Sequence, residues 1–189
     1  MNKYGLPDEL FIRGDIPMTK SEIRALTLTK LSLEEKDVFW DIGAGTGSIS
    51  IEASLNLPLG QVYAIEKNLT AIELIKENIR KFDCKNLTVI QGTAPDAFAG
   101  LPLPTKAVIG GSGGYLEPII NYLWQKTSLE HLIINAVTIK AVYHSIELLS
   151  GMKAVIDAVQ VSVTKIKLVN NLQMLQSQNP IFIISAKRP

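Results

Sequence analysis

The stretch Asp41-Ile42-Gly43-Ala44-Gly45-Thr46-Gly47 decides the fold class of this chain. It follows the apolar run Val38-Phe39-Trp40 and precedes residues 48–56, which have the composition of a helix. A strand, a glycine-rich loop and a helix in this order are typical of a ligand-binding turn, because glycines let a ligand approach the backbone closely. The sequence therefore predicts a ligand-binding loop at the carboxyl end of a strand.

The spacing of these glycines separates two classes of ligand. A dinucleotide site has the pattern G-x-G-x-x-G, with its pyrophosphate at the helix N-terminus. Here the last position of that pattern is Ser48, and the third glycine comes one residue early, at Gly47. The arrangement D-x-G-x-G-x-G instead resembles motif I of the class I S-adenosylmethionine-dependent methyltransferases, whose cofactor carries no phosphate. Asp41 favours this interpretation, because an acidic group suits a cofactor with an ammonium and a sulfonium.

Two further positions are candidate cofactor contacts. Glu66 ends the second predicted strand, close to the spacing of about 20 residues at which an acidic side chain reaches a ribose diol. Its two carboxylate oxygens can accept from both hydroxyls. After the third predicted strand, methyltransferases commonly place an acidic residue beside the adenine, but this chain has Thr93 there. A backbone amide near Ala94 remains as the candidate adenine contact.

Apolar runs alternate with amphipathic stretches from residue 36 onward, which indicates a parallel sheet wrapped by helices. Five βα units are predicted, with strands at 38–42, 61–65, 87–90, 107–109 and 132–136. After Gly151, the extended stretches 154–169 and 181–186 are expected to pair as antiparallel strands that close the sheet. The predicted fold is α/β, of the class I methyltransferase (Rossmann-like) type: a seven-stranded, mostly parallel sheet with an antiparallel C-terminal strand and helices on both faces.

We expect a single domain over residues 1–189. It comprises an N-terminal segment and helix (1–35), the cofactor-binding βα units (36–150) and the C-terminal antiparallel strands (151–189). Thr19-Lys20-Ser21-Glu22 has the spacing of a capping box, which predicts a helix over residues 20–31.

Composition excludes several classes of function. The chain has 189 residues, a formal net charge of +1, one cysteine and two histidines, so neither a disulfide framework nor a zinc cluster is expected. The balanced charge lacks the basic excess of a dedicated nucleic-acid binder. Residues 1–11 read as neither a secretory signal nor a transit peptide, and no apolar run reaches the roughly 20 residues that span a bilayer. A cytoplasmic protein without metal, nucleic-acid or membrane partners is predicted.

The segment after the fourth predicted strand, Ile109-Gly110-Gly111-Ser112-Gly113-Gly114-Tyr115, concerns the methyl acceptor. It lacks the Asp/Asn-Pro-Pro-aromatic motif of the nucleobase amino methylases. Cys84 lies in a polar link between a predicted helix and the third predicted strand, so it does not supply the nucleophile that cytosine carbon methylation needs. Four glycines around one serine leave little side-chain bulk, which favours a broad, flat acceptor lying against the backbone.

Several segments together resemble one family, the decarboxylating cobalt-precorrin-6B carbon-15 methyltransferases of cobalamin biosynthesis, also found as the C-terminal half of a larger precorrin-6Y methylase. They are residues 5–11, 17–24, 41–47, 92–95 and 110–114, in this order, together with Asn179-Pro180. The resemblance implies that S-adenosylmethionine contacts Thr19, Gly43, Ala44, Gly45, Thr46, Gly47, Glu66 and Ala94. It also implies a homo-oligomer, commonly a tetramer in this family.

The resemblance further implies methyl transfer to a meso carbon of a reduced tetrapyrrole, with loss of carbon dioxide from an acetate side chain. Positioning is then expected to matter more than covalent catalysis, because the sulfonium is already activated. Substrate-side candidates are Gly111, Ser112, Gly113, Asn135, Thr138 and Lys140, and no residue is assigned to decarboxylation. Candidate cations for the substrate carboxylates are Lys20, Arg24, Lys140, Lys165 and Lys167.

Two other functions stay open on the sequence alone. One is a class I methyltransferase acting on another acceptor, such as a ring nitrogen of tRNA adenine, although the near-neutral charge disfavours it. The other is a noncatalytic scaffold that kept the fold, which the intact glycines and Glu66 disfavour.

Overall fold

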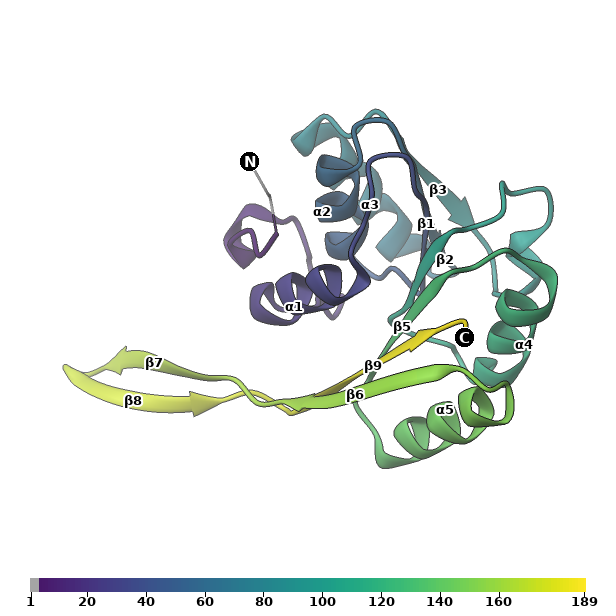
Figure 1. Cartoon of the computed structure of the whole chain (residues 1–189). Coiled ribbons are helices and arrows are strands. Elements are labelled where there is room, and N and C mark those ends of the chain that lie inside the picture. Colours follow the sequence, from purple (N-terminus) through teal and green to yellow (C-terminus); the bar gives the residue numbers. More distant parts are fainter. Residues whose placement is uncertain (1–3) are drawn as a thin grey trace.

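A computed structural model describes residues 4–189 as a twisted sheet covered by helices, with a long hairpin projecting from one end (Figure 1). The first three residues of the predicted N-terminal segment 1–35 lie outside this description. The sheet has seven strands in the order β3-β2-β1-β4-β5-β9-β6. Their bounds are β1 (Val38–Ile42), β2 (Gln61–Glu66), β3 (Leu87–Gln91), β4 (Lys106–Ile109), β5 (His131–Ala136), β6 (Val155–Val161) and β9 (Ile181–Lys187).

Strands β1 to β5 are parallel, and β9 runs antiparallel to both of its neighbours, β5 and β6. The register places Asp41 beside Ala64 of β2 and Val108 of β4, so β1 lies at the centre of the parallel part. The chain order reverses at β1, and in such sheets ligands bind in the crevice outside the carboxyl ends of the strands. The predicted seven-stranded, mostly parallel sheet with an antiparallel strand is confirmed.

Helices cover both faces of the sheet, each through its own apolar cluster. On one face lie α1 (Ser21–Leu31), α2 (Ser48–Asn56) and α3 (Leu69–Phe82), which pack around Leu28, Ile51 and Ile75. On the other face lie α4 (Leu116–Lys126) and α5 (Ile139–Gly151), which pack around Ile120 and Leu149. No helix among residues 4–189 combines the length and apolarity needed to cross a bilayer.

Two local predictions are corrected. Between β3 and β4 the chain forms only the short 3₁₀ turn η2 (Asp96–Phe98), so one of the five βα units lacks an α-helix. A second 3₁₀ turn, η1 (Asp8–Leu10), precedes α1. The N-cap of α1 is Lys20 rather than Thr19, and Asp8 Oδ1 accepts from the Ser21 amide at 3.0 Å. The carboxylate of Asp8 thus satisfies one of the free amides at the start of α1, and no side chain of the predicted capping box does so.

The C-terminal prediction was correct only in part. Val155–Val161 does pair antiparallel with Ile181–Lys187, but the rest of the first stretch leaves the main sheet. It forms a separate two-stranded sheet from β7 (Thr164–Val169) and β8 (Leu172–Ser177), the projecting hairpin of Figure 1. All twelve residues of these two strands are exposed, so the hairpin lacks the core contacts that hold the other strands.

Candidate functional site

Three adjoining cavities follow the carboxyl ends of the parallel strands. The β2–β4 cavity, of about 160 Å³, lies between Ile65, Thr93 and Ser112. The strap cleft, of about 450 Å³, lies beneath Ile16 to Thr19, and the β4–β5 slot, of about 140 Å³, separates the ends of β4 and β5. Gly43 and Glu66 line the first two cavities, Gly111 and Ser112 line the first and third, and Gly110 and Val137 line the last two. The cavities therefore form one belt along the sheet edge.

The first glycine loop, residues 43–47, is packed against the second, residues 110–114. Gly43 has φ +71°, and a Cβ there would lie 2.2 Å from the carbonyl oxygen of Gly111. Gly47, also at positive φ, is the N-cap of α2, and a Cβ there would lie 3.0 Å from Ile75. Both positions require glycine, because the backbone turns into the left-handed region where neighbouring atoms already fill the side-chain space.

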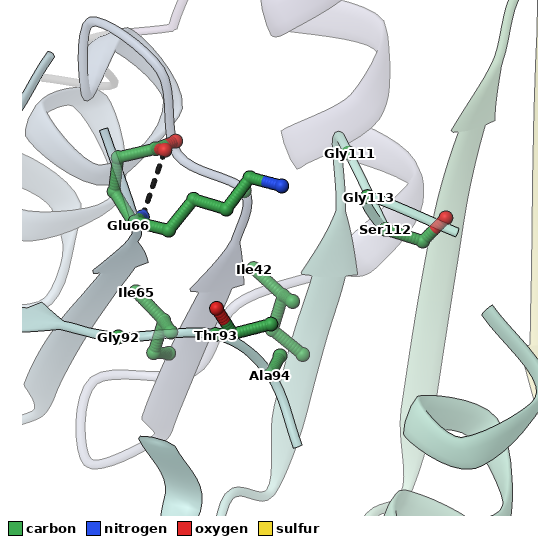
Figure 2. Close-up of a pocket in the computed structure, with 11 residues that line it drawn as sticks. Ile42, Ile65, Glu66, Gly92, Thr93, Ala94, Gly111, Ser112 and Gly113 are labelled. Atoms are coloured by element: carbon green, nitrogen blue, oxygen red, sulfur yellow. Dashed lines mark hydrogen bonds between the residues drawn. The ribbon is translucent and has the colours of Figure 1, made fainter. Parts of the chain in front are cut away.

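The Glu66 carboxylate is bound to the first glycine loop. One of its oxygens accepts from the Gly45 amide at 2.9 Å, and the other accepts from the amides of Lys67 and Asn68 at 2.8 and 2.9 Å. Figure 2 shows Glu66 at the end of its strand, across the β2–β4 cavity from Gly111 and Ser112. The carboxylate holds β2 and the glycine loop at a fixed separation, and its remaining lone pairs stay available to a ligand.

Asp41 lies beneath the first glycine loop and is 1% exposed. Its Oδ2 accepts from the amide and the hydroxyl of Ser50, at 3.1 and 2.6 Å, so it tethers α2 to β1. Burial raises the pKa of Asp41 to about 6; the bonds from Ser50 oppose this shift, and the charge of Glu66 adds to it. A titratable group near neutrality therefore borders the strap cleft.

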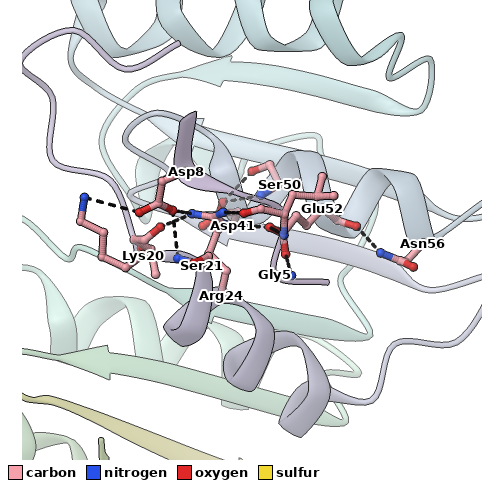
Figure 3. Close-up of polar contacts among 11 residues, drawn as sticks. Gly5, Asp8, Lys20, Ser21, Arg24, Asp41, Ser50, Glu52 and Asn56 are labelled. Carbon is pink, nitrogen blue, oxygen red and sulfur yellow. Dashed lines mark hydrogen bonds and ion pairs between the residues drawn. The ribbon is translucent and has the colours of Figure 1, made fainter. Parts of the chain in front are cut away.

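The N-terminal residues 5–20, which we call the strap, cross over the first glycine loop and are tied down by a buried ion network (Figure 3). Glu52 accepts from the amides of Gly5 and Leu6 at 2.8 and 3.0 Å, and from Arg24 Nε at 2.8 Å. Arg24 also pairs with Asp8 at 2.8 Å and donates to the Thr19 carbonyl. The network holds both ends of the strap and so shapes the roof of the strap cleft.

Asn78 of α3 fastens the middle of the strap. It is fully buried; its Oδ1 accepts from the Ile12 amide at 2.9 Å, and its Nδ2 donates to the Ile12 carbonyl at 2.8 Å. The same Nδ2 lies 3.1 Å from the Thr46 carbonyl in the first glycine loop. One side chain thus links the strap, the glycine loop and α3.

Most of the predicted cofactor contacts line the belt. Thr19, Asp41, Gly43, Ala44, Gly45 and Glu66 line the strap cleft, and Ala94 lines the β2–β4 cavity. Thr46 is 1% exposed and lines none of the three cavities; its hydroxyl has no hydrogen-bond partner among the described residues. The side-chain position of Gly47 faces Ile75 in the packing between α2 and α3. Thr46 and Gly47 therefore support the conformation of the loop and do not line the cavities.

The predicted substrate-side residues also gather in the belt, except one. Gly111, Ser112, Asn135 and Thr138 line the β4–β5 slot, and Gly113 lines the β2–β4 cavity. The Asn135 amide is already bonded to the Thr27 hydroxyl at 3.2 Å, and the Thr138 hydroxyl caps α5 by accepting from Ala141 N. Lys140 is exposed in the first turn of α5.

The other four candidate cations divide into two groups. Arg24 is fully buried and bonded on all sides, so the prediction that it meets substrate carboxylates is wrong. Lys20, Lys165 and Lys167 line a separate groove of about 670 Å³ between the strap and the hairpin, together with Arg13. Lys165 pairs there with Glu22 at 2.9 Å, and Lys20 with Asp8 at 3.6 Å.

Sequence reasoning missed three residues of this region. Asn78 lies in an amphipathic helix, where a polar residue is expected to face solvent. Val137 follows an apolar strand and was expected to be part of its end. Lys67 lines the β2–β4 cavity, and a Cβ on Gly113 would lie 3.0 Å from its Nζ. Its position directly after Glu66 could have indicated that it lies beside the cofactor site. Among residues 4–189, no three His, Cys, Asp or Glu side chains are grouped to hold a metal ion.

The strand order with its antiparallel β9, and the glycine loop bound to an acidic residue at the end of β2, define the α/β fold of the class I methyltransferases. Residues 9–188 match a family model described as precorrin methyltransferase domain. The chain belongs to this family, as the resemblance in its sequence predicted.

Relatives of the chain support this assignment over its full length. It is 35% identical to the cobalt-precorrin-6B C(15)-methyltransferase (decarboxylating) of Salmonella typhimurium, covering 97% of this chain and 96% of the relative. The crystal structure of a precorrin-6Y C5,15-methyltransferase from Geobacter metallireducens superposes with a TM-score of 0.92 at 38% identity, covering 97% of each chain. A structure from Methanobacterium thermoautotrophicum described as precorrin 8w decarboxylase superposes with a TM-score of 0.90 at 27% identity, covering 97% of this chain and all of that one.

Proposed function

We propose that this chain transfers a methyl group from S-adenosylmethionine to carbon 15 of a precorrin or cobalt-precorrin tetrapyrrole and removes carbon dioxide from an acetate side chain. Its membership of the precorrin methyltransferase family supports the reaction class. The observation that carries the proposal at the site is the charge of the strap cleft. Its lining includes Asp41 and Glu66 but no lysine or arginine from the described residues.

This lining fits S-adenosylmethionine and does not fit a dinucleotide. The Gly45 amide, which would face a pyrophosphate in a dinucleotide loop, is bonded to Glu66 instead. Two carboxylates favour a cofactor with an ammonium and a sulfonium and disfavour phosphate. Glu66 would hold the ribose hydroxyls, Ile65 and Ala94 would flank the adenine, and Asp41 with the strap would border the amino acid end.

When bound, the cofactor supplies a methyl group that is already activated for transfer. The contribution of the chain is to hold the acceptor carbon in line with that methyl and to keep water out. The small residues Gly111 and Ser112 leave room for a flat acceptor, since they border both the β2–β4 cavity and the β4–β5 slot. No residue is assigned to the loss of carbon dioxide.

We also propose that the protein is a cytoplasmic homo-oligomer, a tetramer as the family resemblance implies. The hairpin supports association, because Ile166, Leu168, Leu172 and Leu175 are each more than 60% exposed on strands without core contacts. A two-stranded hairpin alone is marginally stable in water. Light scattering on the purified chain would give the mass of four copies; the mass of one copy would contradict this proposal.

The decisive experiment for the reaction is incubation of the chain with the cobalt-precorrin substrate and S-adenosylmethionine carrying a labelled methyl. Mass spectrometry is expected to show one added methyl and the loss of one carbon dioxide. Methylation without that loss would refute the decarboxylating half of the proposal. If calorimetry shows that S-adenosylmethionine does not bind at all, the chain is a noncatalytic relative.

A further inference from the structure

Three large apolar side chains stand exposed where β5 passes into α5. Val137, Ile139 and Tyr143 are 69%, 84% and 66% exposed. Single exposed apolar residues are ordinary on protein surfaces, but a group of them beside a cleft marks a binding surface. We call these three residues the β5–α5 shelf.

The shelf is continuous with the site described above. Val137 lines both the strap cleft and the β4–β5 slot, so it stands at the junction of the proposed cofactor space and the substrate-side candidates. Ile139 begins α5 two residues later. A ligand that touches the shelf can therefore reach the belt without crossing another element.

The shelf is also fixed in shape. Ile139 and Tyr143 are four residues apart on α5, so their side chains lie on the same face of the helix. They adjoin Val142 and Ile146, which are partly buried against the core one helical turn away, so the shelf is the exposed margin of the apolar face of α5. The Thr138 hydroxyl accepts from Ala141 N at 3.2 Å and caps the first turn, which holds Ile139 in place.

The size of the cavities indicates what the shelf binds. The β4–β5 slot holds only about 140 Å³, below the roughly 300 to 1,000 Å³ of pockets that enclose drug-sized ligands. A tetrapyrrole is larger than that, so its macrocycle cannot be enclosed there. It must lie on the surface that borders the slot and present only its reacting edge to the belt.

We propose, on the basis of the function proposed above, that the β5–α5 shelf binds one apolar face of the methyl acceptor's macrocycle. A flat conjugated ring buries its face on Val137, Ile139 and Tyr143, while the carboxylates at its rim meet cations. Lys140 follows Ile139 directly in the sequence and is exposed. The shelf thus supplies the apolar contact and Lys140 a charge at its rim.

The test compares Ile139→Ser and Val137→Ser with Leu59→Ser. Leu59 is 64% exposed in the turn before β2, at the opposite edge of the sheet, and serves as the matched control. The measurements are the KM and kcat for the cobalt-precorrin substrate, the Kd for S-adenosylmethionine by calorimetry, and the mass in solution by light scattering. We expect each shelf variant to raise KM about tenfold or more and the control to leave it unchanged. The cofactor Kd is expected to stay within twofold of wild type in Ile139→Ser, because Ile139 lines neither the strap cleft nor the β2–β4 cavity. Ile139→Leu, which keeps an apolar side chain of similar size, is expected to keep the wild-type KM.

The outcomes separate this inference from the proposed function. An active wild type with unchanged KM in both shelf variants overturns the inference alone. A loss of oligomer mass in Ile139→Ser and Val137→Ser, with KM restored at high protein concentration, also overturns it, because the shelf is then an interface between copies. A wild type that binds S-adenosylmethionine but neither binds nor methylates the tetrapyrrole overturns the proposed function together with the inference.

Discussion

The two glycine loops look alike in the sequence, but Gly43 of the first and Gly111 of the second are glycine for different reasons. In the first loop, residues 43–47, a Cβ on Gly43 would lie 2.2 Å from a backbone oxygen of the second loop. In the second loop, residues 110–114, a Cβ on Gly111 would meet nothing nearer than 4.0 Å. Packing within the protein requires glycine at position 43, whereas at position 111 glycine leaves space open toward the cavities. The same residue type thus serves the fold at Gly43 and leaves room for a ligand at Gly111.

Gly43→Ala should have the largest effect, because its Cβ collides with the Gly111 backbone and its φ of +71° is unfavourable for alanine. We expect the free energy of unfolding to fall by about 3 kcal/mol or more and S-adenosylmethionine binding to be lost. Thermal unfolding and calorimetry measure the two effects. A variant with wild-type stability would show that the loops are free to separate, and the contrast between them would fail.

The pH dependence of stability tests the buried carboxyl beneath the first loop. The pKa of Asp41 is about 6 in the folded chain against an ordinary value of 3.8, so protonation favours the folded state. This contribution is fully present below pH 4 and is lost as pH rises through 6. It amounts to about 3 kcal/mol. Relative to Asp41→Asn, wild type should therefore lose stability between pH 4 and 7 in denaturant titrations; a constant difference would contradict the assignment.

Glu66→Gln should weaken S-adenosylmethionine binding by about 10- to 100-fold, with little change in fold. Both Glu66 oxygens accept from backbone amides. In the glutamine variant one oxygen is replaced by an NH₂ group, which cannot accept. Either the hydrogen bond from Gly45 or those from Lys67 and Asn68 are therefore lost. Calorimetric titration measures the affinity. Glu73→Gln, an exposed change on α3, is the matched control and should bind like wild type.

Gly111→Ala should have the smallest effect on the fold, since its Cβ meets no close neighbour. We expect the free energy of unfolding to change by less than about 1 kcal/mol. The added methyl enters space lined by the β2–β4 cavity and the β4–β5 slot, so the KM for the tetrapyrrole should rise. If this variant is as unstable as Gly43→Ala, Gly111 is also constrained by packing and the two positions do not differ.

The parallel strands could be predicted from the sequence because buried strands are short apolar runs with turn residues between them. β1 was predicted to the residue, and β2 to β5 to within one residue at each end. The hairpin was not predicted, because β8 contains Gln173 and Gln176 within a polar stretch and packs on no core that would impose a pattern. Strand pairing there depends on backbone hydrogen bonds, which leave little trace in composition.

The glycine loop and Glu66 were predictable because their spacing is local, and the structure places them in direct contact. Arg24 and Asn78 were not, because their partners lie far away in the sequence. A sequence shows Arg24 as a cation, but only the fold shows that Glu52 and Asp8 enclose it. Long-range polar contacts of this kind are the part of the site that motifs do not carry.

The position of β9 also constrains how the protein is made. Within residues 4–189, β6 pairs with the sheet only through β9, and residues 181–187 are synthesised after the other strands. Until they leave the ribosome, β5 presents an open edge and β6 has no neighbour, and both are surfaces that other chains can capture. Loss of these few residues would therefore leave a nascent chain with a complete cofactor edge, an open edge on β5 and an unpaired β6, a form prone to aggregate before it can act.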